Sequence, residues 1–141
     1  MVQMPKNPNS LFIDTSFVVA LINTTDLDHV RAVRLANKYK QYPLVTTDAI
    51  LLEIENALSR EYIHESLEII AHFYTSERVM IIHLNSLLLQ RGIEMYNVYQ
   101  PQRWDLVDCL SFVVMHEMGI TEALTSDVHF EQANFIALMR T

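Results

Sequence analysis

Hydrophobic and polar positions follow two different patterns along the chain. Short, unbroken apolar runs are separated by longer segments in which apolar residues recur every three or four positions. The first pattern predicts strands buried on both faces of a sheet, and the second predicts amphipathic helices. The expected strands cover residues 11–13, 43–46, 79–84, 123–125 and 135–139.

Helices are expected between these strands. Pro101 ends one of them and Gly119 ends the next, as these residues commonly do. Strands that alternate with helices of 10–15 residues indicate an α/β fold, here a three-layer α/β/α sandwich around a mostly parallel sheet of four or five strands. The expected helices cover residues 16–22, 29–40, 48–60, 64–75, 86–99 and 104–117, with a helical turn over 128–133.

The length of 141 residues predicts one domain over residues 1–141, in which residues 1–9 form a loose N-terminal tail. No apolar run approaches the 18 or so residues of a membrane span, so no membrane association is expected. A single cysteine, Cys109, excludes an intrachain disulfide and fits a cytoplasmic location.

The net charge of −7 argues against a broad nucleic-acid-binding surface, which is normally basic. It does not exclude an enzyme that reaches phosphate through bound metal ions. The expected helix 29–40 carries Arg31, Arg34, Lys38 and Lys40 on one face. That face is either simply solvated or a weak candidate for contact with a polyanion.

Two aspartates directly follow apolar strands. Asp14 comes after residues 11–13, and Asp127 comes shortly after residues 123–125. Ligands of open α/β sheets bind outside the carboxyl ends of the strands, so both carboxylates fall where a site is expected. The alternative is that each aspartate only caps the helix that follows it.

Further acids lie near the starts of two expected helices. Glu53 and Glu55 flank the apolar stripe of one helix almost symmetrically, so geometry alone does not choose between them. Asp105 is expected to be the N-cap of the other helix, with Asp108 as its capping-box partner. That helix is apolar nearly all round, so Asp108 is expected to face the interior, which is tolerable if a metal or the helix dipole compensates its charge.

Four such carboxylates at one sheet edge would need a cation. At a separation of ~5 Å and an effective dielectric constant of ~20, each pair repels by roughly 3 kcal/mol. Ligation by oxygen alone points to Mg²⁺ or Mn²⁺. Phosphotransfer with Asp14 as nucleophile fits poorly, because Ser16 stands where that chemistry usually has a second aspartate.

In these acids and in the residues around them, the chain resembles the PIN-domain nucleases, in particular the VapC-like toxins of toxin–antitoxin pairs, and the similar segments occur in the same order. The matching segments are residues 12–16, 50–53 with Asn56 and Leu58, 104–112, and 123–135, the last being the most specific. The resemblance implies a divalent-metal-dependent ribonuclease whose acidic quartet activates water. It implies that Asp14, Glu53, Asp108 and Asp127 form that quartet, which favours Glu53 over Glu55, and that Thr15 or Ser16 helps to orient the ligands.

The resemblance also implies partners: an RNA substrate, a second copy of the chain in a homodimer, and a small antitoxin protein. Two positions depart from the family pattern. Val107 stands where the family usually has Thr, and Asn134 where it often has Gly. Loss of the Thr hydroxyl could weaken metal binding, so a catalytically inactive PIN module acting as a scaffold is the alternative function.

The six histidines show no zinc-binding spacing. His29 and His129 are expected near the same sheet edge as the acids, with packing at a helix start as the favoured role. Cys109 is expected to be a structural thiol in a buried helix.

Overall fold

The computed structural model describes residues 4–141. Strands and helices alternate along the chain, as the hydrophobic pattern predicts. The strands are β1 (Leu11–Ile13), β2 (Leu44–Thr47), β3 (Val79–Ile82), β4 (Glu122–Leu124) and β5 (Ile136–Ala137). The α-helices are α1 (Thr15–Ile22), α2 (His29–Lys38), α3 (Asp48–Leu58), α4 (Ile63–Thr75), α5 (Ser86–Val98), α6 (Leu106–Met118) and α7 (Val128–Gln132), and two 3-10 turns are η1 (Gln100–Gln102) and η2 (Leu138–Arg140).

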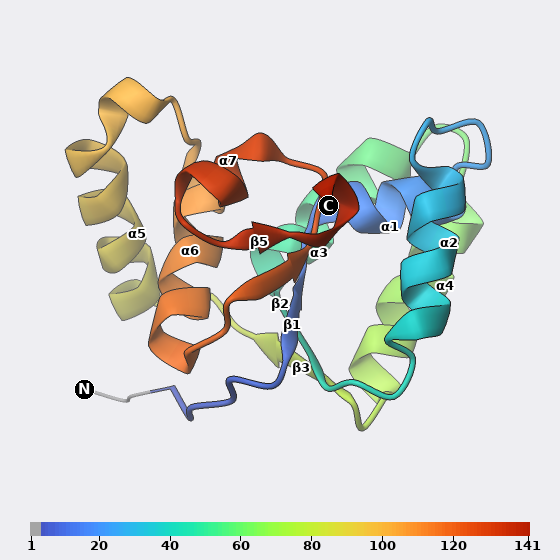
Figure 1. Cartoon of the computed structure of the whole chain (residues 1–141), viewed down its shortest axis with the longest axis horizontal. Coiled ribbons are helices and arrows are strands. Elements are labelled where there is room, and N and C mark those ends of the chain that lie inside the picture. Colours follow the sequence, from blue (N-terminus) through green and yellow to red (C-terminus); the bar gives the residue numbers. More distant parts are fainter. Residues whose placement is uncertain (1–3) are drawn as a thin grey trace.

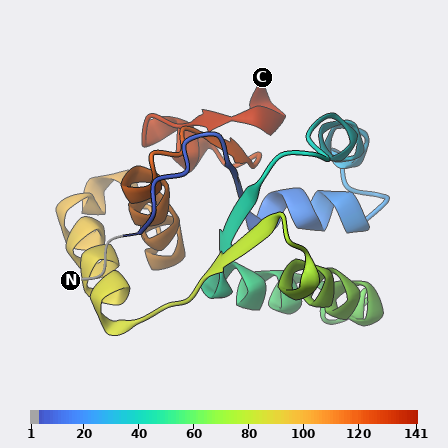
Figure 2. The same ribbon diagram turned by 90° about the horizontal axis from the view of Figure 1, so that it is seen from below.

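The five strands form one sheet in the order β3-β2-β1-β4-β5, and every neighbouring pair is parallel. Helices α1 to α4 lie on one side of the sheet, and α5, α6 and α7 lie on the other (Figures 1 and 2). The predicted α/β fold with a parallel sheet between helical layers is therefore confirmed.

The central strand β1 is completely buried, with every residue 1 % exposed or less. Helix α6 is the most buried helix, because eight of its thirteen residues are buried. This helix is apolar nearly all round because it lies between α5 and the sheet (Figure 2). β1 and α6 therefore give the site a rigid base.

Most boundaries differ from the predicted ones by one or two residues, and two of these differences have a clear cause. Helix α6 begins at Leu106 instead of residue 104, because Asp105 is extended and caps it. The last strand, expected over residues 135–139, is only Ile136–Ala137, and the chain then turns into η2. Apolar side chains in a short buried turn give the same sequence pattern as a strand, so the pattern did not distinguish the two.

The segment before β1 forms no helix or strand between residues 4 and 10. It is less loose than the expected tail, because the backbone N–H of Asn7 donates to the carbonyl of Met118 at 2.9 Å. Residues 1–3 of that expected tail lie outside the described residues. In the described part of the chain, no helix combines the length and the apolar character needed to span a bilayer.

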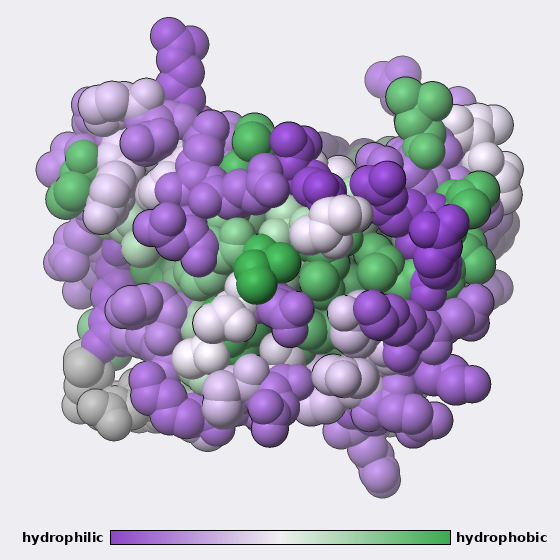
Figure 3. Space-filling view, viewed as in Figure 1, coloured by the Kyte–Doolittle hydropathy of each residue, from purple (hydrophilic) through white to green (hydrophobic). Residues whose placement is uncertain are grey.

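One face of the molecule is mostly hydrophilic, with hydrophobic surface across its middle (Figure 3). The edge strand β5 runs across the same face in Figure 1, and its Ile136 is exposed. The hydrophilic residues to the right of this view lie over α2.

Candidate metal centre

The candidate site lies where the direction of the chain across the sheet reverses. After β1 the chain enters α1 on one side of the sheet, and after β4 it enters α7 on the other. Because β1 and β4 are neighbours, a crevice opens between their carboxyl ends, as is usual in open α/β sheets. Asp14 follows β1 and Asp127 follows β4 at this crevice.

Asp14 is buried and held by two hydroxyl groups. Thr125 Oγ1 donates to Asp14 Oδ2 at 2.6 Å, and Ser16 Oγ donates to the same oxygen at 3.0 Å. Asp14 precedes α1, but its side chain makes no capping hydrogen bond. The capping alternative for Asp14 is therefore wrong, and its carboxylate is fixed by the loop after β4 instead.

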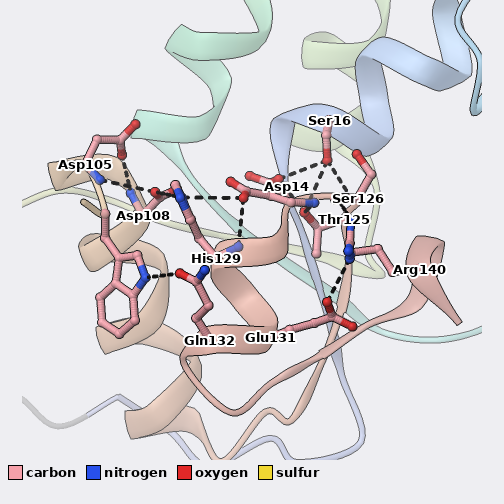
Figure 4. Close-up of polar contacts among 12 residues, drawn as sticks. Asp14, Ser16, Asp105, Asp108, Thr125, Ser126, His129, Glu131, Gln132 and Arg140 are labelled. Carbon is pink, nitrogen blue, oxygen red and sulfur yellow. Dashed lines mark hydrogen bonds and ion pairs between the residues drawn. The ribbon is translucent and has the colours of Figure 1, made fainter. Parts of the chain in front are cut away.

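Further hydrogen bonds join the loops after β1 and β4. The backbone N–H of Ser126 donates to Ser16 Oγ at 3.0 Å, and that of Asp127 donates to Thr125 Oγ1 at 3.0 Å (Figure 4). The expected supporting role of Ser16 thus corresponds to a real contact. Thr125 was missed in the sequence, although its position directly after β4 and two residues before Asp127 is a usable signal.

Glu53 reaches the crevice from the middle of α3. Thr15 Oγ1 donates to Glu53 Oε1 at 2.7 Å, so a hydroxyl from the start of α1 orients this carboxylate. Glu55 is exposed and is not among the residues that line the cleft. The geometry therefore separates the two glutamates that the helical pattern left equivalent.

Asp108 both caps α6 and enters the crevice. Asp108 Oδ2 accepts from the backbone N–H of Asp105 at 3.2 Å, and Asp105 Oδ1 accepts from that of Asp108 at 2.7 Å, which forms the predicted capping box. His129 Nδ1 also lies 2.9 Å from Asp108 Oδ2. The two interpretations of Asp108 are therefore compatible, because capping leaves its side chain only 12 % exposed beside another ionisable group.

His129 bridges two carboxylates. Its Nδ1 lies 3.5 Å from Asp127 Oδ1 in addition to its contact with Asp108 (Figure 4). Asp127 in turn caps α7, because its Oδ1 accepts from the backbone N–H of His129 at 2.9 Å. The sequence placed His129 at the correct sheet edge but favoured packing as its role, and its polar contacts correct that view.

The four predicted acids, together with Thr15 and Ser16, line a cleft of about 570 Å³, whereas Thr125 and His129 support it from behind through their contacts with Asp14, Asp108 and Asp127. Three of its acids were not expected in the site: Asp105, taken only as a cap, and Asp26 and Asp28 in the loop before α2. No Lys or Arg is among the lining residues of the described chain. The carboxylates that line the cleft are Asp14, Asp26, Asp28, Glu53, Asp105, Asp108 and Asp127.

Burial and mutual repulsion raise the pKa of three of these carboxyl groups, those of Asp14, Glu53 and Asp108. Burial raises the pKa of Asp14, with Asp127 adding repulsion while Thr125 and Ser16 oppose the shift. Burial, followed by repulsion from Asp105, raises the pKa of Asp108 to about 6 despite the contact with His129. Burial also raises the pKa of Glu53, and Asp105, Asp14 and Asp127 add to it, while the Thr15 hydrogen bond opposes it.

The residues fit a divalent cation. Carboxylate oxygens are the ligands that Mg²⁺ and Mn²⁺ prefer, and imidazole nitrogen is acceptable to Mn²⁺. Ligand atoms of Asp108, Asp127 and His129 lie within 4.8 Å of one another. A cation at this place would favour the ionised carboxylates and so oppose both the burial and the repulsion that raise the pKa values, which supplies a physical reason for so many acids in one cleft.

The sheet order, the cleft at the β1/β4 crevice and the carboxylates around it define a PIN-type nuclease site, and the chain matches the PIN domain family over residues 11–136. The chain belongs to the PIN-domain family, and the predicted resemblance to PIN-domain nucleases of the VapC type is confirmed.

The relatives found are similar in length to this chain. The chain is 31% identical over 126 residues to the 23S rRNA-specific endonuclease VapC20 of two Mycobacterium tuberculosis strains, CDC 1551 / Oshkosh and ATCC 25618 / H37Rv. This similarity covers 89% of the chain and 95% of the relative. The crystal structure of M. tuberculosis VapC20, a toxin that cleaves the sarcin–ricin loop, matches with a TM-score of 0.79 at 30% identity, over 89% of this chain and 96% of that one.

One departure from the family pattern has a simple structural explanation. Asn134, where the family often has Gly, adopts a left-handed backbone with φ of 70°. Asn tolerates this conformation better than most non-glycine residues, so the substitution keeps the turn between α7 and β5. Val107 is partly buried against the core, and its effect on metal binding stays a prediction.

Proposed function

We propose that this protein is a divalent-metal-dependent ribonuclease of the VapC toxin type, with Asp14, Glu53, Asp108 and Asp127 as the metal-binding quartet. One observation carries the proposal. The four carboxylates come from the end of β1, from α3, from α6 and from the loop after β4, and they line one cleft with no Lys or Arg among the described residues that line it.

The chemistry proposed for this cleft is hydrolysis of an RNA phosphodiester. A Mg²⁺ or Mn²⁺ ion bound there supplies a nucleophilic water near neutral pH and stabilises the charge that develops on the phosphate. The water oxygen forms a bond to phosphorus, the bond from phosphorus to the leaving ribose oxygen breaks, and a proton goes to that oxygen.

The protein's part in this reaction is to hold and orient the ligands. Thr125 and Ser16 fix one oxygen of Asp14, and Thr15 fixes one oxygen of Glu53. His129 Nδ1 lies against carboxylate oxygens of both Asp108 and Asp127, so this side chain helps to hold two of the proposed ligands in position. These contacts support the metal ligands in the way that outer contacts commonly tune metal affinity.

The substrate we propose to try first is a structured ribosomal RNA loop, because the relatives act on 23S rRNA and its sarcin–ricin loop. The test is cleavage of an RNA hairpin carrying that loop, with Mg²⁺, with Mn²⁺ and with EDTA. Cleavage only in the presence of metal supports the proposal. Cleavage that survives EDTA would overturn the metal-dependent mechanism.

An inactive PIN module that acts as a scaffold is the alternative. Retention of all four quartet acids in one cleft favours the enzyme. Calorimetric titration of Mg²⁺ separates the two functions, since a scaffold without a metal site gives no saturable heat. Wild-type protein that binds metal but cuts no RNA would support the alternative.

We also propose a homodimer and a small antitoxin as partners. Large apolar side chains remain exposed on two helices, α4 and α5, and such surfaces commonly mark protein contacts. They include Ile63, Leu67 and Tyr74 on α4 and Ile93, Tyr96 and Val98 on α5. Light scattering at micromolar concentration tests the dimer, and a monomer of 16.4 kDa would exclude it.

A further inference from the structure

Two arginines line a hollow that adjoins the acidic cleft. This hollow, of about 370 Å³, shares Asp28 and Ser126 with the cleft, and its other walls include Arg31 of α2 and Arg140 near the C-terminus. The chain has only ten basic residues, so a pair beside the most acidic part of the molecule calls for an explanation.

A third arginine lies beside a different part of the cleft. A hollow of about 310 Å³ shares Val19, Asn56 and Ala57 with the acidic cleft, and Arg60 contributes to its lining. Each of these two hollows therefore adjoins the acidic cleft through shared residues, and each contains arginine.

The arginines beside Ser126 are held in place by the fold. Arg140 Nε donates to Glu131 Oε1 at 2.7 Å, and its Nη1 donates to the carbonyl of Ser126 at 3.4 Å (Figure 4). Arg31 Nη1 donates to the carbonyl of Met139. A guanidinium group carries five N–H donors, so these contacts leave others for an anion. The Arg140 side chain is 42 % exposed, which keeps it accessible.

Charge explains why a ribonuclease of this kind needs such groups. An RNA strand brings one negative phosphate per nucleotide, and the metal ions can neutralise only the phosphate at the centre of the cleft. The neighbouring phosphates would meet carboxylates. Arginine is well suited to bind them, because its planar donors match phosphate oxygens.

We infer that the RNA backbone crosses the acidic cleft from the hollow lined by Arg31 and Arg140 to the hollow lined by Arg60, and that these arginines bind the phosphates on either side of the cleavage point. This inference rests on the proposed ribonuclease function and adds the residues that position the substrate. In the sequence, the basic face of helix 29–40 was only a weak candidate for contact with a polyanion, and the inference assigns that contact to Arg31. The other basic residues of that face, Arg34, Lys38 and Lys40, line none of these three hollows.

The test compares Arg31→Gln, Arg140→Gln and Arg60→Gln with a matched control. Arg78→Gln removes the same charge and, like Arg31→Gln, loses a bond from Nη1 to a backbone carbonyl, here that of Tyr42 at 2.9 Å. Arg78 precedes β3 and so lies at the amino-end edge of the sheet, away from the cleft. Thermal melting first establishes that all four variants fold.

Binding is measured on a fluorescent RNA hairpin with Ca²⁺ in place of Mg²⁺, after a check that the RNA stays intact. Each of the three cleft-side variants should bind about fivefold more weakly at 0.1 M salt, and the slope of log affinity against log salt should fall by about 0.7, the value for one lost phosphate contact on a single strand. Arg140→Lys keeps the charge and should recover most of the affinity. In Mg²⁺, KM should rise while kcat changes little.

Two results would overturn the inference while leaving the ribonuclease intact: cleft-side variants that match Arg78→Gln in affinity and salt slope, or a loss of kcat at unchanged KM. If the variants instead lose only the binding of an acidic peptide, the arginines serve a protein partner and the inference is wrong. Wild-type protein that cleaves no RNA at all contradicts the proposed function itself, so the two failures are distinguishable.

Discussion

Helix α6 contributes to two hollows of nearly equal size and opposite character. Its first turn supplies Asp108 to the acidic cleft of about 570 Å³, whereas its later turns supply Phe112 and Met115 to a hollow of about 590 Å³. The second hollow is lined largely by aromatic and apolar residues, among them Tyr99 and Trp104. Size therefore says nothing about which hollow carries the chemistry.

The two hollows differ in whether their polar and ionisable side chains have partners that satisfy them. In the apolar hollow, Tyr99 stacks on Trp104 with ring centroids 5.0 Å apart, and Trp104 Nε1 donates to Gln132 Oε1 at 3.1 Å. In the acidic cleft, buried carboxyl groups repel one another and their pKa values rise. Strongly perturbed ionisable groups in a cleft are typical of functional sites, and side chains that satisfy one another are typical of packing.

The largest expected effect is the loss of RNA cleavage when acids of the acidic cleft are replaced. Asp14→Asn, Glu53→Gln, Asp108→Asn and Asp127→Asn should each lower RNA cleavage by more than about 100-fold, since each removes a proposed metal ligand. Initial rates in saturating Mg²⁺ measure this. Glu55→Gln, on the same helix as Glu53 but outside the cleft, is the control and should stay active. An inactive Glu55→Gln with an active Glu53→Gln would reverse the assignment.

The next effect uses pH. Because the pKa of Asp108 is raised to about 6, a proton competes with the metal below that pH. Mg²⁺ affinity should therefore fall about tenfold between pH 7 and pH 5, measured by calorimetry.

The contribution of Asp108 to the unfolding free energy of the metal-free protein should instead be larger at low pH. A raised pKa favours the protonated folded form, so this contribution is complete below pH 4 and is lost as pH rises through 6.

Comparison of wild type with Asp108→Asn isolates that contribution from the other acids. The unfolding free energy of Asp108→Asn should exceed that of wild type at pH 7.5 in EDTA, and the gap should close towards pH 4. A gap that is constant with pH would show that Asp108 is already ionised without difficulty in the folded protein.

A smaller effect is expected in melting temperature. Asn can keep the capping contacts of Asp108 while removing its charge, so the metal-free melting temperature should rise by about 2–6 °C. The stabilisation by saturating Mg²⁺ should shrink in the same variant. Asp48→Asn is the control, because Asp48 lies in the first turn of α3 and accepts from the backbone N–H of Leu84, outside the cleft. If Asp108→Asn leaves both quantities unchanged, Asp108 acts only as a cap.

The smallest effect is expected in the apolar hollow. Tyr99→Ala removes a ring that stacks on Trp104 and should cost about 1 kcal/mol of stability. Cleavage in Mg²⁺ should remain within about twofold of wild type, and the increment in melting temperature on adding Mg²⁺ should be unchanged. A large loss of cleavage would mean that both hollows take part in the reaction, and the comparison would fail.

The sequence predicted the sheet, its helical layers and the places of Asp14 and Asp127, because apolar strands and the polar residues after them leave a clear local pattern. It did not predict Thr125 as the partner of Asp14, a contact across 111 positions. Nor did it show that Asp26 and Asp28 reach the cleft, because the packing of α2 against α1, which brings their loop there, leaves no local pattern in the sequence. The local hydrophobic pattern predicts the helices and strands, whereas the packing of loops that are distant in the sequence decides which side chains come into contact.

The pairing of β1 with β4 has a consequence for synthesis of the protein. Asp14 leaves the ribosome 111 residues before its partner Thr125, and Asp127, a proposed metal ligand, follows Thr125. The strand β1 can pair with β2 long before β4 exists, so a growing chain can fold its first half while its carboxylates lack their counterparts. The cleft is therefore assembled only after Asp127 has been made, and a growing chain that has not reached β4 lacks part of the proposed metal site.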